Sequence, residues 1–152
     1  MTKNDKYIPV AKPIIYEKVK EYVCNAIDDK ALSGTYGVYI DKFEQKFAEF
    51  VKANFAISTT NGTNALHTAL VALKIGDGDE VLVQSLTNMA TAFAVSYTGA
   101  KVIPVDSEIK TGNINPSLIE NLINKKTKAI IVVHLFGHPV DMEMIVLIAK
   151  KY

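Results

Sequence analysis

Apolar residues in the first third of the chain recur at the spacing of two amphipathic helices. In residues 15–27 they return every three or four positions, until the run Ser33-Gly34-Thr35-Tyr36-Gly37 breaks the pattern. In residues 40–51 they do so again, with charged side chains on the opposite face. We therefore predict that residues 1–54 form a helical segment.

The rhythm changes at residue 55, where short apolar runs begin to alternate with helical patterns. We predict strands over residues 55–58, 80–84, 101–105 and 129–133. We predict helices over residues 63–74, 89–97, 117–124 and 141–150. Strands separated by helices pair in parallel, because a parallel connection needs a crossover. The prediction for residues 55–152 is thus an α/β fold with a mostly parallel sheet and flanking helices.

Composition and charge narrow the classes of function. With 49% hydrophobic and 22% charged residues among 152, the chain has the composition of a folded globular protein. Its net charge is +1 and all 17 basic residues are lysines, which argues against nucleic acid as a partner. The single cysteine, Cys24, excludes an internal disulfide and a four-cysteine zinc site. We find no signal-peptide pattern and no apolar run long enough to cross a bilayer, so we expect a cytoplasmic protein with no membrane partner.

The turn Thr59 to Asn64 carries the clearest chemical signal, because it follows a predicted strand and leads into a predicted helix. Gly62 allows a ligand to approach the backbone closely. The N–H groups of Thr63, Asn64 and Ala65 would face outward, where the helix dipole favours an anion such as phosphate. The same residues also make a helix N-cap with no ligand, and the turn alone favours that simpler interpretation.

A series of short motifs runs through nearly the whole chain in a recognisable order. The motifs are Ser33-Gly34, Tyr39 to Glu44, Asn61 to His67, Gly76 to Val81, Ser85-Leu86-Thr87, Ala90-Thr91-Ala92, Gly99-Ala100, Val105-Asp106 and Thr127 to Gly137. This series resembles the DegT/DnrJ/EryC1/StrS family of pyridoxal-phosphate-dependent aminotransferases, and within it the perosamine-synthase-like members. No single motif is specific, but so many in register make coincidence improbable.

The resemblance implies the fold-type-I aminotransferase architecture and a homodimer. Residues 1–54 would be the N-terminal helical segment of the large domain, and residues 55–152 the first part of its α/β cofactor-binding region. The implied reaction moves an amino group from a donor such as glutamate onto a keto-deoxy sugar linked to a nucleotide. Such sugars serve surface polysaccharide or related biosynthesis.

The resemblance also assigns candidate cofactor contacts. Gly62, Thr63 and Asn64 would bind the phosphate of pyridoxal 5'-phosphate, in agreement with the phosphate interpretation of that turn. Position 88 is an aromatic residue stacked on the pyridine ring in many members, but in this sequence it is Asn88, which offers less apolar contact area. His134, at the end of a predicted strand, is a candidate to face the cofactor.

Two further residues and one histidine pair complete the candidates. Ser33 and Tyr36 lie in the loop between the first two predicted helices and are candidate substrate contacts. Tyr36 would reach the substrate across a dimer interface; the alternative is an exposed loop tyrosine with no ligand. His134 and His138 have the i, i+4 spacing of a helical metal pair, but Gly137 and Pro139 interrupt a helix and no third ligand is evident. We therefore predict no metal site.

The resemblance places the central catalytic groups of the family after the last residue of this sequence. In the family, the strand after the helix that ends near Lys151 bears the aspartate that pairs with the pyridinium nitrogen. The lysine that forms the internal Schiff base comes later still, and none of the 17 lysines stands in its motif. We therefore expect an N-terminal portion with no catalytic residue, inactive alone.

Two other functions stay open at this point. One is a non-catalytic remnant or subunit that binds a complementing polypeptide. The other is a dinucleotide-binding enzyme, which rests on fold analogy alone, because no glycine-rich dinucleotide fingerprint follows a predicted strand.

Overall fold

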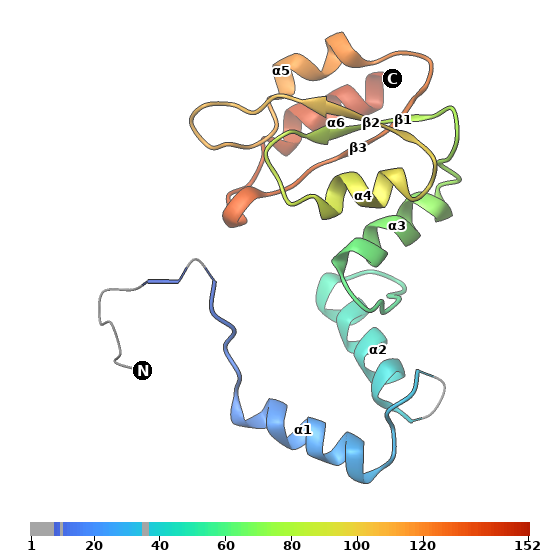
Figure 1. The fold of residues 1–152 in the computed structure, drawn as a ribbon, viewed down its shortest axis with the longest axis vertical. Coiled ribbons are helices and arrows are strands. Elements are labelled where there is room, and N and C mark those ends of the chain that lie inside the picture. Colours follow the sequence, from blue (N-terminus) through green and yellow to red (C-terminus); the bar gives the residue numbers. More distant parts are fainter. Residues whose placement is uncertain (1–7, 10, 35–36) are drawn as a thin grey trace. The chain divides into compact units, whose positions relative to one another are not determined.

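The computed structural model describes residues 8, 9, 11–34 and 37–152 (Figure 1). The chain forms two compact units, Met1–Ser58 and Thr59–Tyr152.

The first unit contains the two predicted amphipathic helices, α1 at Glu17–Asp28 and α2 at Tyr39–Val51. No residue of α1 is buried, and its apolar side chains Val19, Tyr22 and Val23 are 45 to 54% exposed. In α2, the rings of Phe43 and Phe47 contact each other with their centroids 5.6 Å apart. Both helices therefore present apolar faces that the described part of this unit does not cover.

The segment 55–58 was predicted as a strand, and that prediction is wrong for the described structure. Its apolar side chains Phe55 and Ile57 are 87% and 77% exposed, so the described residues form no layer that packs against this segment. The Glu44 carboxylate accepts hydrogen bonds from the backbone N–H of Ser58, at 2.7 Å, and from its hydroxyl, at 2.9 Å. Both hydrogen bonds lower the pKa of Glu44, and the bond from the backbone N–H has the larger effect. The Glu44 side chain therefore occupies the Ser58 N–H, which a neighbouring strand would need as a hydrogen-bond donor.

The second unit is built on a parallel sheet of three strands, which confirms the predicted α/β class (Figure 1). The strands are β1 at Glu80–Gln84, β2 at Lys101–Val105 and β3 at Thr127–Ile131, in the order β2-β1-β3. The first two match their predicted bounds. The third begins two residues earlier than predicted, and the register between β1 and β3 shifts at Glu80 and Val81.

Helices cover both faces of this sheet. The unit contains α3 at Gly62–Ala72, α4 at Ala90–Ser96, α5 at Pro116–Ile119 and α6 at Met142–Lys151, with 3-10 turns η1 at Glu120–Leu122 and η2 at Leu135–Gly137. Figure 1 shows α4 on one side of the sheet and α5 and α6 on the other. Among the described residues, no helix has both the length and the apolar character needed to cross a bilayer.

The alternation of side chains along the strands divides the core into two clusters. Val81 and Val83 of β1 face one way and pack with side chains of α3 and α4, among them Leu70 and Val95. Leu82 faces the other way, into a cluster with side chains of α5 and α6. These three β1 residues are 0 to 3% exposed, so this central strand is buried on both faces as parallel strands usually are.

Two predicted helices end at least two residues earlier in the structure. The helix predicted over 63–74 ends at Ala72, and Lys74 adopts a left-handed backbone with φ 58°. The helix predicted over 117–124 begins with Pro116 behind an Asn115 cap, and then tightens into a 3-10 turn. Ile123 is already extended there, because the chain must turn into β3.

Candidate functional site

The turn before α3 is a helix N-cap built by Asn61. The Asn61 backbone is extended, and its side-chain Oδ1 accepts the N–H of Asn64 at 2.9 Å. The Asn61 carbonyl accepts the N–H of Ala65 at 3.1 Å. Two of the three N–H groups expected to face a ligand therefore have partners within the turn. The N-terminal N–H groups without a partner in the helix are those of Gly62 and Thr63.

The space beside the Gly62 α-carbon is open. A Cβ added at Gly62 would meet no atom of the described chain within 4 Å. Gly62 is exposed and Thr63 is half-buried, and the Thr63 side chain adds a hydroxyl to the turn. Two amide donors, a hydroxyl and the positive end of the dipole of α3 suit a phosphate group.

Hydrogen bonds within the turn hold this opening in shape. The Asn64 side-chain amide donates to the Thr60 hydroxyl at 2.6 Å, and the Thr59 hydroxyl donates to the Asn61 carbonyl at 3.0 Å. Asn64 thus acts on the turn through its side chain, while its backbone N–H serves the Asn61 cap. The cap interpretation and the phosphate interpretation are compatible, because the cap leaves two donors unused.

Topology places this turn toward the edge of the sheet where ligands usually bind. α3 leads through residues 73–79 into the amino end of β1, so its own start points toward the carboxyl ends of the strands. In open α/β sheets, ligands bind outside those carboxyl ends. Three loops leave the sheet there, at residues 85–89, 106–115 and 132–141.

Asn88 lies in the first of these loops and is exposed. Its side-chain Oδ1 accepts the N–H of Ala90 at 2.9 Å, and its carbonyl accepts the N–H of Thr91 at 3.1 Å. These bonds start α4, so an asparagine has a local structural role at this position.

His134 lies in the third loop and is also exposed. Its Nδ1 accepts the backbone N–H of Val140 at 3.1 Å. Because a backbone N–H can only donate, a neutral His134 carries its proton on Nε2. The loop therefore fixes the tautomer as well as the ring, and Nε2 is the nitrogen that can donate to a ligand.

The histidine pair considered as metal ligands is not on a helix. The 3-10 turn η2 separates His134 from His138, and Phe136 within it has a left-handed φ of 51°. The described residues contain no group of three or more histidine, cysteine or acidic side chains placed to hold a metal ion.

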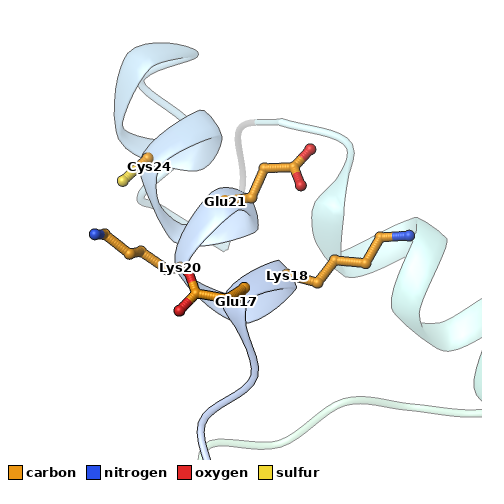
Figure 2. A pocket seen from close by; sticks show the side chains of 5 residues that line it. All are labelled: Glu17, Lys18, Lys20, Glu21 and Cys24. Atoms are coloured by element: carbon orange, nitrogen blue, oxygen red, sulfur yellow. The ribbon is translucent and has the colours of Figure 1, made fainter.

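The two candidate substrate residues belong to the first unit. Ser33 lies in the loop after α1, within the described residues, and Tyr36 lies outside them. The same unit has a shallow hollow along α1, lined by Glu17, Lys18, Lys20, Glu21 and Cys24. Figure 2 shows Lys18 and Lys20 pointing to opposite sides of the helix, so these side chains do not converge on a ligand.

Sequence reasoning missed two buried amides at the carboxyl edge, Gln84 and Asn113. Gln84 closes β1, and Asn113 lies in the loop after β2. A polar residue at the end of an otherwise apolar strand was the signal that could have found Gln84. Both side chains have hydrogen-bond partners in loops distant in sequence, which the sequence pattern does not reveal.

Comparison with known proteins places this geometry in a family. Residues 13–152 match the model of the DegT/DnrJ/EryC1/StrS aminotransferase family. The chain is 52% identical over 146 residues to GDP-perosamine synthase of Escherichia coli O157:H7, covering 96% of this chain and 40% of the relative. It is 45% identical over 139 residues to dTDP-3-amino-3,6-dideoxy-alpha-D-galactopyranose transaminase of Aneurinibacillus thermoaerophilus, covering 90% of this chain and 38% of the relative.

Solved structures agree with the sequence relatives. The putative sugar aminotransferase Spr1654 of Streptococcus pneumoniae, in its PLP form, superposes with a TM-score of 0.84 at 29% identity. The match covers 95% of this chain and 36% of that one. The chain thus spans about 40% of the length of the Escherichia coli relative. With its family model matched over residues 13–152, the chain belongs to the DegT/DnrJ/EryC1/StrS aminotransferase family.

Proposed function

We propose that this chain is the N-terminal portion of a pyridoxal-phosphate-dependent aminotransferase that converts a nucleotide-linked keto-deoxy sugar into an amino sugar. The amino donor is a compound such as glutamate, and the product serves surface polysaccharide or related biosynthesis. The relatives named above support the substrate class, because they act on GDP- and dTDP-linked sugars by name. The structural observation that carries the proposal is the open turn at Gly62 and Thr63.

In this proposal each candidate residue has a part in holding the cofactor or the substrate. Pyridoxal phosphate supplies an electron sink when bound, and the protein holds and orients it. The N–H groups of Gly62 and Thr63 bind its phosphate, and Asn64 keeps the turn in shape. Asn88 lies against the ring face, and His134 offers Nε2–H as a donor. Ser33 and Tyr36 contact the sugar nucleotide.

We further propose that this portion is inactive alone and works within a homodimer of the whole enzyme. The aspartate and the Schiff-base lysine of the family then belong to the part of the relatives that this chain does not cover. The expectation rests on the family resemblance and on the share of the relatives that the chain spans.

The phosphate contact can be tested by comparing ligands that differ only in the phosphate. We expect the chain to bind pyridoxal phosphate at least about tenfold more tightly than pyridoxal, because hydrogen bonds to a charged group contribute about 1.5 to 3 kcal/mol. Thr63→Val should reduce this preference, whereas Thr68→Val, the same change further along α3, should leave it intact. Equal binding of the two ligands, or an equal effect of the two substitutions, would refute the phosphate site.

A second candidate function is a non-catalytic subunit that binds a complementing polypeptide. Its support is uncovered apolar surface. The apolar face of α1 is about half exposed, and a groove beside the edge strand β3 is lined by residues that include Ile130, Ile145 and Tyr152. Size-exclusion chromatography with light scattering tests this candidate, since a well-behaved monomer at high concentration would count against it.

A further inference from the structure

The two buried amides at the carboxyl edge of the sheet have an unusual degree of isolation from water. Gln84 is 1% exposed and Asn113 is 0% exposed. Burying an amide is costly unless its donors and acceptor find partners. The hydrogen-bond partners of these two side chains therefore indicate their role in the fold.

Gln84 joins the loop after β1 to the loop after β2. Its Nε2 donates to the carbonyl of Leu86 at 2.7 Å and to the carbonyl of Gly112 at 3.1 Å. Its Oε1 accepts the N–H of Ile114 at 3.0 Å. Both N–H groups and the oxygen are used, and two of the three bonds hold the residues on either side of Asn113.

Asn113 joins the loop after β2 to the loop after β3. Its Nδ2 donates to the carbonyls of His138, at 3.0 Å, and Pro139, at 3.3 Å. Its Oδ1 accepts the N–H of Leu135 at 3.0 Å. These three bonds hold the segment that directly follows His134.

The three loops meet around Gly112. A Cβ added there would lie 3.0 Å from Cδ2 of Leu135 and 3.2 Å from Cδ2 of Leu86. One side chain thus comes from the loop after β3 and the other from the loop after β1. The contact shows that the loops are packed together as well as hydrogen-bonded.

We propose that Gln84 and Asn113 form a two-amide relay that sets the loop of Asn88 and the loop of His134 in one fixed arrangement. They are positioning residues. The hydrogen bonds of the Gln84 side chain go to the loops after β1 and β2, so Gln84 acts on the loop after β3 through the backbone on either side of Asn113. The ligand of these loops rests on the proposed function, but the relay itself is a property of this chain.

An apolar side chain of similar volume could fill the same space without joining the loops. It would leave the carbonyls of Leu86 and Gly112 and the N–H of Ile114 without their partner. The relay and a volume-filling role therefore predict different results at a distance. Only the relay predicts that a substitution at Gln84 lowers the hydrogen-exchange protection of the Leu135 N–H.

Amide hydrogen exchange of the whole chain measures this coupling directly. Gln84→Glu keeps the shape but replaces the donor pair with an acceptor, and we expect protection of the Leu135 N–H to fall about tenfold. Gln84→Met, uncharged and of similar length, should give the same loss if the buried carboxylate prevents folding. Gln45→Glu makes the matched change on the exposed face of α2 and should leave Leu135 unaffected.

Ligand binding is a second measurement, and it distinguishes a loss of the relay from a general loss of stability. The hydrogen bonds of the Gln84 side chain go to Leu86, Gly112 and Ile114 and not to the turn at Gly62 and Thr63, so Gln84→Met should leave binding of inorganic phosphate unchanged. Binding of pyridoxal phosphate, which also reaches the loops, should weaken.

The relay is overturned if Leu135 keeps its protection while that of Ile114 falls, because the two amides would then act independently. An equal loss of phosphate and pyridoxal phosphate binding would also overturn it. Failure of the unsubstituted chain to bind either ligand would instead refute the proposed function. In that case the exchange result alone decides for or against the relay.

Discussion

Replacing Gly112 by alanine tests the packing of the three carboxyl-edge loops. Gly112 has φ +73°, a left-handed conformation that costs an alanine about 1 to 2 kcal/mol. The added Cβ would also press on the Leu135 and Leu86 methyl groups at 3.0 and 3.2 Å. Those side chains can give way in part, since Leu86 is 55% exposed. We therefore expect a total loss of about 2 kcal/mol in the free energy of unfolding, with about 1 kcal/mol from the backbone and about 1 kcal/mol, the low end of overpacking costs, from the contacts.

Two other glycines separate the backbone cost from the packing cost. Gly78→Ala has the same backbone problem, with φ +86°, but its Cβ would meet nothing within 4 Å. Gly76→Ala has neither problem, because its nearest contact is an ordinary 3.5 Å to the carbonyl of Thr98. We expect a loss of about 1 kcal/mol for Gly78→Ala and no loss, or a small gain, for Gly76→Ala.

Urea unfolding followed by circular dichroism measures all three variants on one scale, since the midpoint shifts with stability when the slope is constant. We expect Gly112→Ala to be the least stable, followed by Gly78→Ala and then Gly76→Ala. If Gly112→Ala and Gly78→Ala unfold at the same urea concentration, the loops do not pack around Gly112 in the way the distances indicate.

The structure predicts the outcomes of three further changes. Asn61→Ala removes the cap on the Asn64 N–H and should lower the free energy of unfolding by about 1 kcal/mol, measured by urea unfolding against Asn25→Ala on the exposed surface of α1. Leu82→Ala should cost about 2 to 5 kcal/mol, because Leu82 is 0% exposed in the core, whereas Leu73→Ala, at 67% exposure, should cost far less in the same assay. The Ser58 bonds lower the pKa of Glu44 below its usual 4.5, so their contribution is present above that pH and is lost as the pH falls through the lowered value. Amide NMR of Ser58 should report that loss on acidification, and Glu44→Gln should abolish the transition; an unchanged Ser58 signal across the acidic range would contradict the Glu44 contact.

The sequence correctly predicted the elements whose pattern of apolar residues follows from the packing of those residues against other elements. β1 and β2 have the predicted bounds, because each is a short apolar run packed between helices. The amphipathic helices α1 and α2 were predicted by their apolar spacing, although α1 buries none of its residues within the described structure. Residues 55–58 have the same apolar character, yet the Glu44 carboxylate holds Ser58 outside any sheet. Side-chain bonds of this kind depend on tertiary contacts that periodicity does not encode.

The candidate site was predictable to a similar extent. The turn at Gly62 was identified from a glycine and hydroxyl side chains at a helix start, and the structure adds which donors the Asn61 cap consumes. The tautomer of His134 follows only from its bond to Val140. Gln84 and Asn113 could not be paired from sequence, because they lie 29 positions apart and are connected through the backbone beside Asn113.

We propose that the turn at Gly62 and Thr63 binds phosphate and that none of the 17 lysines of this sequence holds the cofactor covalently. The most direct test is an absorbance titration of the purified chain with pyridoxal phosphate, followed by borohydride reduction and measurement of the intact mass. We expect saturable, phosphate-dependent binding with no stoichiometric adduct, or with only scattered labelling of surface lysines. A single, stoichiometric lysine adduct would contradict the claim, because one of the 17 lysines would then serve as the covalent anchor.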